Sequence, residues 1–215
     1  RNDPSSSEAI DAAKAIAQSL AQTGIVFLRE PRIDTTTADA FLDMLEDYFD
    51  QPDNLKAPDQ RSELHYQVGT TPEYVEVPLC KATDKCKLDA AALSPTNRPA
   101  PVGGADPKWR FFWRIGERPK EGGFEDLSAA PVVPAAFPQW AETMDNWGSL
   151  MLGAVTTCAE MTAVGFSLPR DAFSRLMVGA PHLLAPTGSA LGKHNAVGTP
   201  PAGWHGDLTL LPIHY

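Results

Sequence analysis

The feature that most limits how this chain can fold is a long apolar stripe that begins at Trp140. Its members recur at alternating spacings of four and three residues, as on one face of a helix; they are Trp140, Met144, Trp147, Met151, Ala154, Cys158 and Met161. Gly165 follows them and predicts the end of the helix. Such a stripe can dimerise as a coiled coil, but one that ends in glycine after this length more often packs along a sheet. We therefore expect a long amphipathic helix on a sheet, with Cys158 in the core.

The strongest candidate for a strand of that sheet is the aromatic segment 109–116, WRFFWRIG. Large apolar side chains alternate with the others along it, which is the pattern of a strand with one buried face; the apolar set is Trp109, Phe111, Trp113 and Ile115. Aromatic residues among arginines can also stack on nucleic-acid bases, but a single such strand in an acidic chain favours a packing role. Arg110 and Arg114 are candidates for a substrate pocket, because a guanidinium group matches a carboxylate with two hydrogen bonds.

Two helices and a short strand are predicted near the N-terminus. Ser5 and Glu8 fit a capping box, and Gly24 is placed to end the first helix. Residues 25–28, IVFL, favour a buried strand because all four are β-forming or apolar. A second helix is expected over residues 36–50, and Pro52 follows its end. Its apolar face is expected to contain Phe41, Leu42, Leu45 and Phe49.

Residues 51–104 are polar and contain many prolines, so they give few clear signals. Residues 74–77 suit a short strand, and His65 is most simply a solvated surface residue. Cys80 and Cys86 bracket the sequence KATDK, but a zinc site would need a second pair of ligands at matching spacing. Three cysteines without a framework spacing predict reduced thiols rather than disulfide bonds.

The character of the chain changes at residue 179, where turn residues and short apolar segments begin. Two segments, 182–185 and 204–213, predict strands that a long connection joins. A short helix is expected just before them, with Pro169 in its first turn. We therefore divide the chain into a helical and strand region, residues 1–178, and a second region of strands, residues 179–215.

Composition narrows the class of protein. The 215 residues carry a net charge of −9 and a pI near 5.0, which argues against nucleic-acid binding because phosphate contacts need clustered lysine and arginine. No apolar run approaches a membrane span, and the N-terminus has no signal-peptide core. We expect a soluble, cytoplasmic protein, with an organelle as the alternative because the chain begins with Arg1 rather than Met. The phosphate loops of nucleotide-binding folds and the GxSxG elbow of hydrolases do not occur.

The chemistry of the chain is expected at the motif His205, Gly206, Asp207. Side chains two residues apart on a strand project to one face, so His205 and Asp207 would supply two ligands of a 2-His-1-carboxylate site for ferrous iron. His214 is the only later histidine, but its odd spacing from His205 would aim it at the opposite face. We therefore expect the third ligand to be absent from these residues, because the chain is a fragment or because its site is incomplete. The alternative is an exposed strand pair without a function.

Four segments carry a resemblance to a known family; they are YQVGTTPEYVEVP, DPKWRFFWRIGERP, PHLLAPTGS and GWHGDLTLLPIHY. With the order of two N-terminal helices, a long helix and a final HxD segment, the chain resembles a microbial and algal branch of the isopenicillin N synthase-like family of iron(II)- and 2-oxoglutarate-dependent dioxygenases. The resemblance spans about residues 12–215. It implies an α+β fold with a double-stranded β-helix (jelly-roll) core, here incomplete, whose first strands are residues 179–215. N-terminal helices and the long amphipathic helix would pack on its sheet.

The resemblance also implies cofactors, partners and site residues. By match to the family motif, His205 and Asp207 bind Fe(II), and 2-oxoglutarate is the co-substrate. The family's later histidine and its 2-oxoglutarate-binding arginine have no match here. His182 is a further candidate for the substrate pocket, with a structural role as its alternative.

The implied reaction is oxidation of a small organic substrate by molecular oxygen. One alternative is a non-catalytic oxygenase-fold subunit, which acts as a structural or interaction module with protein assembly partners. A metal-independent binder of small molecules that uses the same barrel is a third hypothesis.

Overall fold

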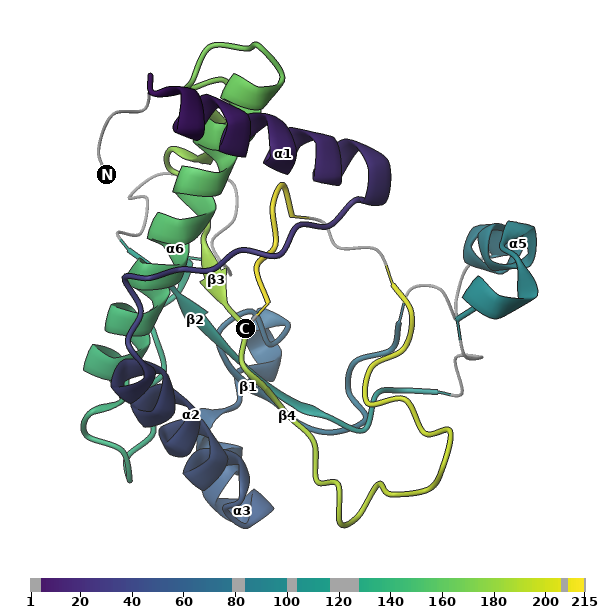
Figure 1. The fold of residues 1–215 in the computed structure, drawn as a ribbon. Helices are drawn as coiled ribbons and strands as arrows, with labels where there is room; N and C mark the ends of the chain where they lie inside the picture. The colour runs from purple at the N-terminus through teal and green to yellow at the C-terminus, as the bar shows by residue number, and fades with distance from the viewer. Residues whose placement is uncertain (1–4, 79–83, 100–103, 117–127, 206–208, 215) are drawn as a thin grey trace.

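The computed structural model describes residues 5–78, 84–99, 104–116, 128–205 and 209–214, and only the backbone of residues 84–87. The elements, in chain order, are α1 (Ser7–Thr23), α2 (Thr35–Phe49), α3 (Asp53–Lys56), η1 (Ala57–Asp59), η2 (Ser62–Leu64), β1 (Gly69–Thr71), α5 (Asp84–Ala92), η3 (Pro95–Asn97), β2 (Trp109–Arg114), α6 (Trp140–Gly165), η5 (Ser174–Met177), β3 (Leu183–Leu184) and β4 (Thr187–Gly188). Helices α1, α2 and α6 lie on one side of a small sheet, and the long connections and helix α5 lie on the other side (Figure 1).

The long helix α6 is confirmed, and it is the longest described element. Its predicted stripe is buried from Trp140 to Cys158, and Met161 is partly buried. The helix ends at Gly165 as expected, but the left-handed conformation falls on Ser167, whose φ is 59°. Gly165 is needed for packing instead, because a Cβ atom there would lie 2.2 Å from the carbonyl oxygen of Ala13 on α1. Helix α1 therefore crosses α6 at backbone contact distance.

Strand β2 is the centre of the sheet, with antiparallel neighbours on both sides. Its alternation is as predicted, because Trp109, Phe111 and Trp113 are all at most 6% exposed. On one side it pairs with β1, and on the other with β3 and β4, which keep a single register along it. Phe111 N–H donates to the carbonyl of Pro186 between β3 and β4 at 2.9 Å. Proline has no N–H to return, so the ladder is interrupted there although the chain stays extended.

The main core lies where α2 and α6 pack against β2. The ring of Tyr48 on α2 is fully buried and meets the edge of Phe111 with a centroid distance of 5.4 Å. Trp140 on α6 contacts Phe111 at 4.6 Å, and Phe41 stacks on Trp147 at 4.8 Å. Aromatic pairs at these separations add to the free energy of area burial. The two helices and the strand are thus joined by one aromatic cluster.

Both N-terminal helices are confirmed, with local corrections. Ser6 rather than Ser5 caps α1, since its hydroxyl accepts the Ala9 N–H at 3.2 Å, and Gly24 ends the helix in the left-handed conformation. Asp34 caps α2. Leu42 is 45% exposed, so its assignment to the apolar face was wrong; the buried residues of α2 are Ala38, Phe41, Met44, Leu45 and Tyr48.

Three predicted strands are not observed. Residues 25–28 form no strand, and Phe27 is 90% exposed. Residues 74–77 are irregular, as are the described residues of the segment 204–213. A strand requires a neighbour for its N–H and C=O groups, and among the described residues none of these segments gains a full ladder partner.

The fold class is confirmed in its coarser part, as mixed helices and an antiparallel sheet with a long helix packed on it. The described strands form one small sheet and do not show a jelly roll. The division at residue 178 remains a prediction. Within the described part of the chain, no helix is long and apolar enough to cross a membrane.

Candidate functional site

The histidine of the predicted metal motif is described, but its partner is not. His205 is exposed, and its ring Nδ1 lies 2.7 Å from the carbonyl oxygen of Gly203. A carbonyl oxygen can only accept a hydrogen bond, so Nδ1 carries the proton and the lone pair of the neutral ring is on Nε2. Asp207 lies outside the described residues, and its role beside His205 remains a prediction.

A buried carboxylate holds the backbone that precedes His205. The N–H of Gly203, itself buried, donates to Asp106 Oδ1 at 2.8 Å. Asp106 is only 5% exposed, and its second oxygen accepts Lys108 Nζ at 2.8 Å. Lys108 also lies 3.2 Å from Glu76, so its charge is shared between two carboxylates. The segment that carries the motif is therefore anchored to the residues just before β2.

The backbone of Asp106 is fixed on both sides by a third segment. The Asp106 N–H donates to the carbonyl of Glu76 at 2.8 Å, and its own carbonyl accepts the Tyr74 N–H at 2.9 Å. This pairing involves the segment predicted as a strand at residues 74–77, although only these isolated bonds form. The carboxylate of Asp106 thus projects from a backbone that has little freedom to move.

The three predicted pocket residues have structural partners. Arg110 forms an ion pair with Glu76 and stacks over Phe112 at 3.7 Å, and burial lowers its pKa against the attraction of Glu76. Arg114 is 7% exposed, with Nη1 at 3.4 Å from the hydroxyl of Ser128. The ring of His182 lies 3.0 Å from the carbonyl of Met177. Among the described residues, the contacts of Arg110 and His182 do not include His205.

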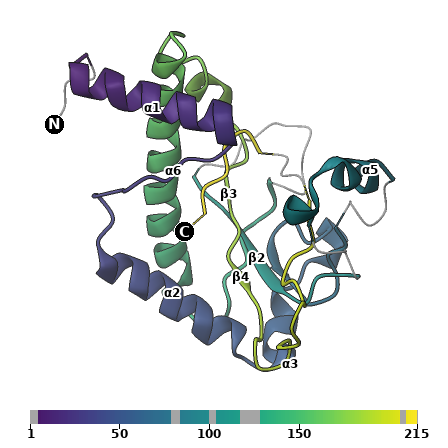
Figure 2. The same cartoon turned by 45° about the vertical axis from the view of Figure 1, so that its right-hand side comes forward.

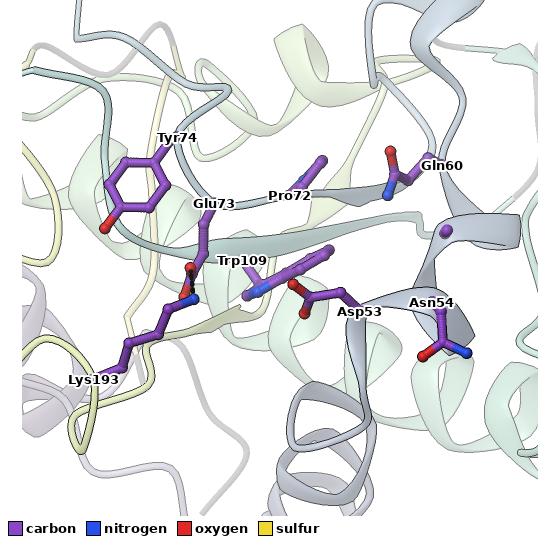
Figure 3. Close-up of a pocket in the computed structure, with 9 residues that line it drawn as sticks. Asp53, Asn54, Gln60, Pro72, Glu73, Tyr74, Trp109 and Lys193 are labelled. Atoms are coloured by element: carbon purple, nitrogen blue, oxygen red, sulfur yellow. Dashed lines mark hydrogen bonds and ion pairs between the residues drawn. The ribbon is translucent and has the colours of Figure 1, made fainter.

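A separate pocket of about 520 Å³ lies beside α3, beyond the end of β1 (Figure 3). Its lining residues are Asp53, Asn54, Ala57, Gln60, Pro72, Glu73, Tyr74, Trp109 and Lys193. Figure 3 shows Glu73 and Lys193 pointing toward one another across it, with their charged atoms 2.7 Å apart. The described candidates Arg110, Arg114, His182 and His205 do not line this pocket.

Glu73 also holds the connection that leads to the metal motif. Its Oε1 lies 3.0 Å from His194 Nε2, and the hydroxyl of Tyr74 lies 3.3 Å from the other ring nitrogen. Burial alone would raise the pKa of Glu73, but the hydrogen bonds from Lys193 and His194 outweigh it and lower the pKa. Glu73 is therefore an ionised anchor for residues 193–194.

Sequence reasoning missed Asp106, Glu73 and His194. Asp106 lies 97 residues from Gly203, and Glu73 lies 121 residues from His194. A hydrophobic period cannot reveal a polar contact between segments so far apart. The only local signal was the cluster of charged residues just before β2, which had no assigned role.

The described residues fit a metal in part. The arrangement of His205 matches that of metal-binding histidines, which usually donate the second ring N–H to a carbonyl or carboxylate. Among the described residues, however, no group of three His, Cys, Asp or Glu side chains could hold an ion. The structure thus supplies one oriented donor, and the second predicted one lies in the segment 206–208, outside the described ranges. Cys158 is not a candidate, because it is buried and burial raises the pKa of its thiol.

Comparison with known proteins gives matches only among solved structures, since no family model and no curated protein matches the chain. A full-length Neurospora crassa protein in complex with alpha-KG matches with a TM-score of 0.57 and 16% identity, over 83% of this chain and 49% of that chain. A putative 2OG-Fe(II) oxygenase family protein from Caulobacter crescentus matches with a TM-score of 0.61 and 16% identity, over 83% and 51%. JOX2 in complex with 2OG, Fe and JA matches with a TM-score of 0.54 and 14% identity, over 84% and 45%.

The matches agree with one another and with the resemblance drawn from the sequence. The chain spans about half the length of the structures that it matches. At these identities the likeness concerns the fold, and function is a separate question. The chain has the fold of the corresponding part of the 2OG-Fe(II) oxygenases.

Proposed function

We propose that this chain is part of an iron(II)- and 2-oxoglutarate-dependent dioxygenase that oxidises a small organic molecule with molecular oxygen. The observation that carries the proposal is the orientation of His205, whose Nδ1 proton is held by the Gly203 carbonyl at 2.7 Å. It occurs in an HxD motif on a chain with the fold of such oxygenases. The solved structures with this fold include the Neurospora crassa protein in complex with alpha-KG and JOX2 in complex with 2OG, Fe and JA.

The residues of the chain would divide the work as follows. His205 Nε2 and the carboxylate of Asp207 would bind the metal, since imidazole and carboxylate together suit ferrous iron. Bound iron with 2-oxoglutarate would supply the oxidising chemistry. The Gly203 carbonyl keeps the His205 ring in the tautomer that presents a nitrogen lone pair to a metal. No described residue is assigned as the third ligand.

The substrate is proposed to be small and organic, and the pocket candidates stay Arg110, Arg114 and His182. Arg110 is already paired with Glu76, so a substrate carboxylate would have to share the guanidinium with that residue. The ring of His182 is bound to the Met177 carbonyl, which favours a structural role for it. Arg114 is the more deeply buried of the two arginines, at 7% exposure.

One observation favours the second candidate function, a non-catalytic subunit in a larger assembly. Three of the four apolar side chains of residues 25–28 are exposed, namely Ile25 at 55%, Phe27 at 90% and Leu28 at 47%. Exposed apolar residues that lie close together are typical of surfaces that contact another protein. A subunit of this kind would keep the fold and the exposed segment without turning over 2-oxoglutarate.

The two functions are separated by succinate release from purified full-length protein supplied with ferrous iron, 2-oxoglutarate and oxygen. We expect release that depends on iron and is lost in the His205→Ala variant. The matched control is His214→Ala, which removes a histidine at the spacing that disfavours a ligand and should retain release. Absence of iron-dependent turnover in the wild type, or equal turnover in the wild type and His205→Ala, would contradict the oxygenase.

A further inference from the structure

We propose that Asp106 is the positioning residue that orients His205 for metal binding, through the backbone of Gly203. The inference rests on the proposed function, because it takes His205 as a ligand. Asp106 is 97 residues from Gly203 in the sequence, and neither the HxD motif nor the fold comparison assigns it a role. Its place in the structure gives it one.

The first step is the chain of hydrogen bonds. Asp106 Oδ1 accepts the Gly203 N–H at 2.8 Å, and the Gly203 carbonyl accepts the His205 Nδ1 proton at 2.7 Å. Both bonds are made by one residue, although they belong to two peptide units that meet at the Cα atom of Gly203. Because a peptide unit is planar, the bond from the Gly203 N–H to Asp106 fixes the unit that ends at Gly203, and with it the position of the Cα atom from which the carbonyl projects.

Asp106 is itself held in place by burial, by an ion pair and by its backbone hydrogen bonds. Its side chain is 7% exposed, and its charge is balanced by Lys108 at 2.8 Å. Its backbone is bonded to the segment 74–76 at both the N–H and the carbonyl. A carboxylate has enough acceptor positions to hold a backbone N–H with one oxygen and an ammonium group with the other. Alanine could do neither.

Removal of the Asp106 carboxylate should change the tautomer of the His205 ring. In Asp106→Ala the Gly203 N–H would be buried without a partner, which favours release of the segment into water. The His205 ring would then lose the fixed acceptor of its Nδ1 proton, and with it the bond that favours the Nδ1–H tautomer over the Nε2–H tautomer. Loss of such supporting groups lowers metal affinity by about 10–100-fold.

Two variants and one control isolate the effect. Asp106→Ala removes both bonds, whereas Asp106→Asn keeps an oxygen for the Gly203 N–H and loses the charge and the oxygen that accepts Lys108 Nζ. Glu73→Gln is the control, since it weakens another anchor of the same connection, at Lys193 and His194, and leaves Gly203 untouched. Backbone chemical shifts of β2 and α6 show that each variant remains folded.

The first readout needs no metal. Ring 15N shifts of His205 in the 215-residue protein, at a pH of about 8.5 where imidazoles are neutral, report the tautomer. We expect Nδ1–H in the wild type, in Asp106→Asn and in Glu73→Gln, and a shift toward Nε2–H in Asp106→Ala. An unchanged tautomer in folded Asp106→Ala would overturn the inference, and so would the loss of Nδ1–H in Asp106→Asn.

The second readout is the affinity for Co(II) as a stand-in for ferrous iron, measured on the full-length protein by calorimetry. Asp106→Ala should bind about 10–100-fold more weakly than the wild type, and Asp106→Asn within about threefold of it. If His205→Ala does not weaken Co(II) binding, the ligand role and the proposed function fail, even where the tautomer follows Asp106. If His205→Ala abolishes binding but Asp106→Ala leaves it unchanged, only the positioning role fails.

Discussion

The aromatic core and the connection that carries the metal motif are held in opposite ways. In the core, Tyr48, Phe111 and Trp140 are completely buried and contact one another through their rings. In the connection, residues 189–205 are mostly exposed and have no helix or strand. A few polar bonds hold that connection, chiefly those of Glu73 and Asp106.

The difference shows that the scaffold and the candidate site depend on different physics. Burial of a large ring contributes several kcal/mol and tolerates small changes in position. A single hydrogen bond contributes about 1 kcal/mol and has a strict geometry. Mutations in the core should therefore change the free energy of unfolding, whereas mutations in the anchors should change the connection without unfolding the protein.

The largest expected effect tests the core with two neighbouring residues of α2. Phe41 is 5% exposed and stacks on Trp147, whereas Leu42 is 45% exposed. Phe41→Ala should lower the free energy of unfolding by about 3–5 kcal/mol. Leu42→Ala should lower it by less than about 1 kcal/mol, as expected of a surface position.

Urea unfolding followed by circular dichroism measures both variants. Equal losses of unfolding free energy in the two variants would contradict the distinction between core and surface positions.

An intermediate effect is expected from Asp59, a buried carboxylate that contacts the core. Asp59 is 7% exposed and accepts the Tyr48 hydroxyl at 3.0 Å. Burial raises its pKa above the ordinary 3.8, against the hydrogen bond from Tyr48 and the attraction of Arg61. The folded state therefore holds this proton more tightly than the unfolded state. Its contribution to stability is present below pH 3.8 and is lost as the pH rises through the raised pKa.

Asp59→Asn removes this titration, so the difference in unfolding free energy between the wild type and the variant should shift against the wild type as the pH rises. Each unit of the pKa shift corresponds to about 1.4 kcal/mol. The measurement is urea unfolding at a series of pH values, and the difference isolates Asp59 from the other acids. A difference that does not vary with pH would show that burial does not perturb this group.

The smallest effect on stability is expected in the connection. Glu73→Gln weakens the bonds to Lys193 and His194 but touches no core contact, so the free energy of unfolding should fall by less than about 1 kcal/mol. Limited proteolysis between residues 189 and 203 should nevertheless become faster, because the segment opens locally.

The control is Glu160→Gln, which weakens the ion pair with Arg170 far from the connection. It should leave the rate of proteolysis unchanged. A Glu73→Gln variant as resistant as the wild type would show that other contacts hold the connection.

The sequence predicted the elements whose buried residues recur at a short and regular spacing. The stripe of α6 and the alternation of β2 were correct, because each periodic pattern fits one element. The predicted apolar face of α2 was partly wrong. Leu42 lies next to Phe41 in the sequence, and the periodicity of a 15-residue helix does not define where its apolar face ends. The strand at residues 25–28 failed because a strand also depends on its neighbours, which composition does not supply.

The candidate site was less predictable than the scaffold. The motif at His205 was visible in the sequence, but the carboxylate of Asp106 that holds its backbone was not, because that contact joins segments 97 residues apart. The same holds for Glu73 and His194. Such contacts depend on how β2 and the connection meet in space, which only the assembled fold determines.

Because α6 is long, mutations near its two ends should change the free energy of unfolding independently of each other. Its 26 residues span about 39 Å, and α1 and α2 contact it near opposite ends (Figures 1 and 2). The close crossing at Gly165 and the rings stacked on Trp147 lie 18 residues apart (165 − 147) on the helix. Free-energy changes at such separated junctions add without coupling. The helix therefore joins two independently tunable attachments, so that either end of the scaffold can change without altering the strength of the other.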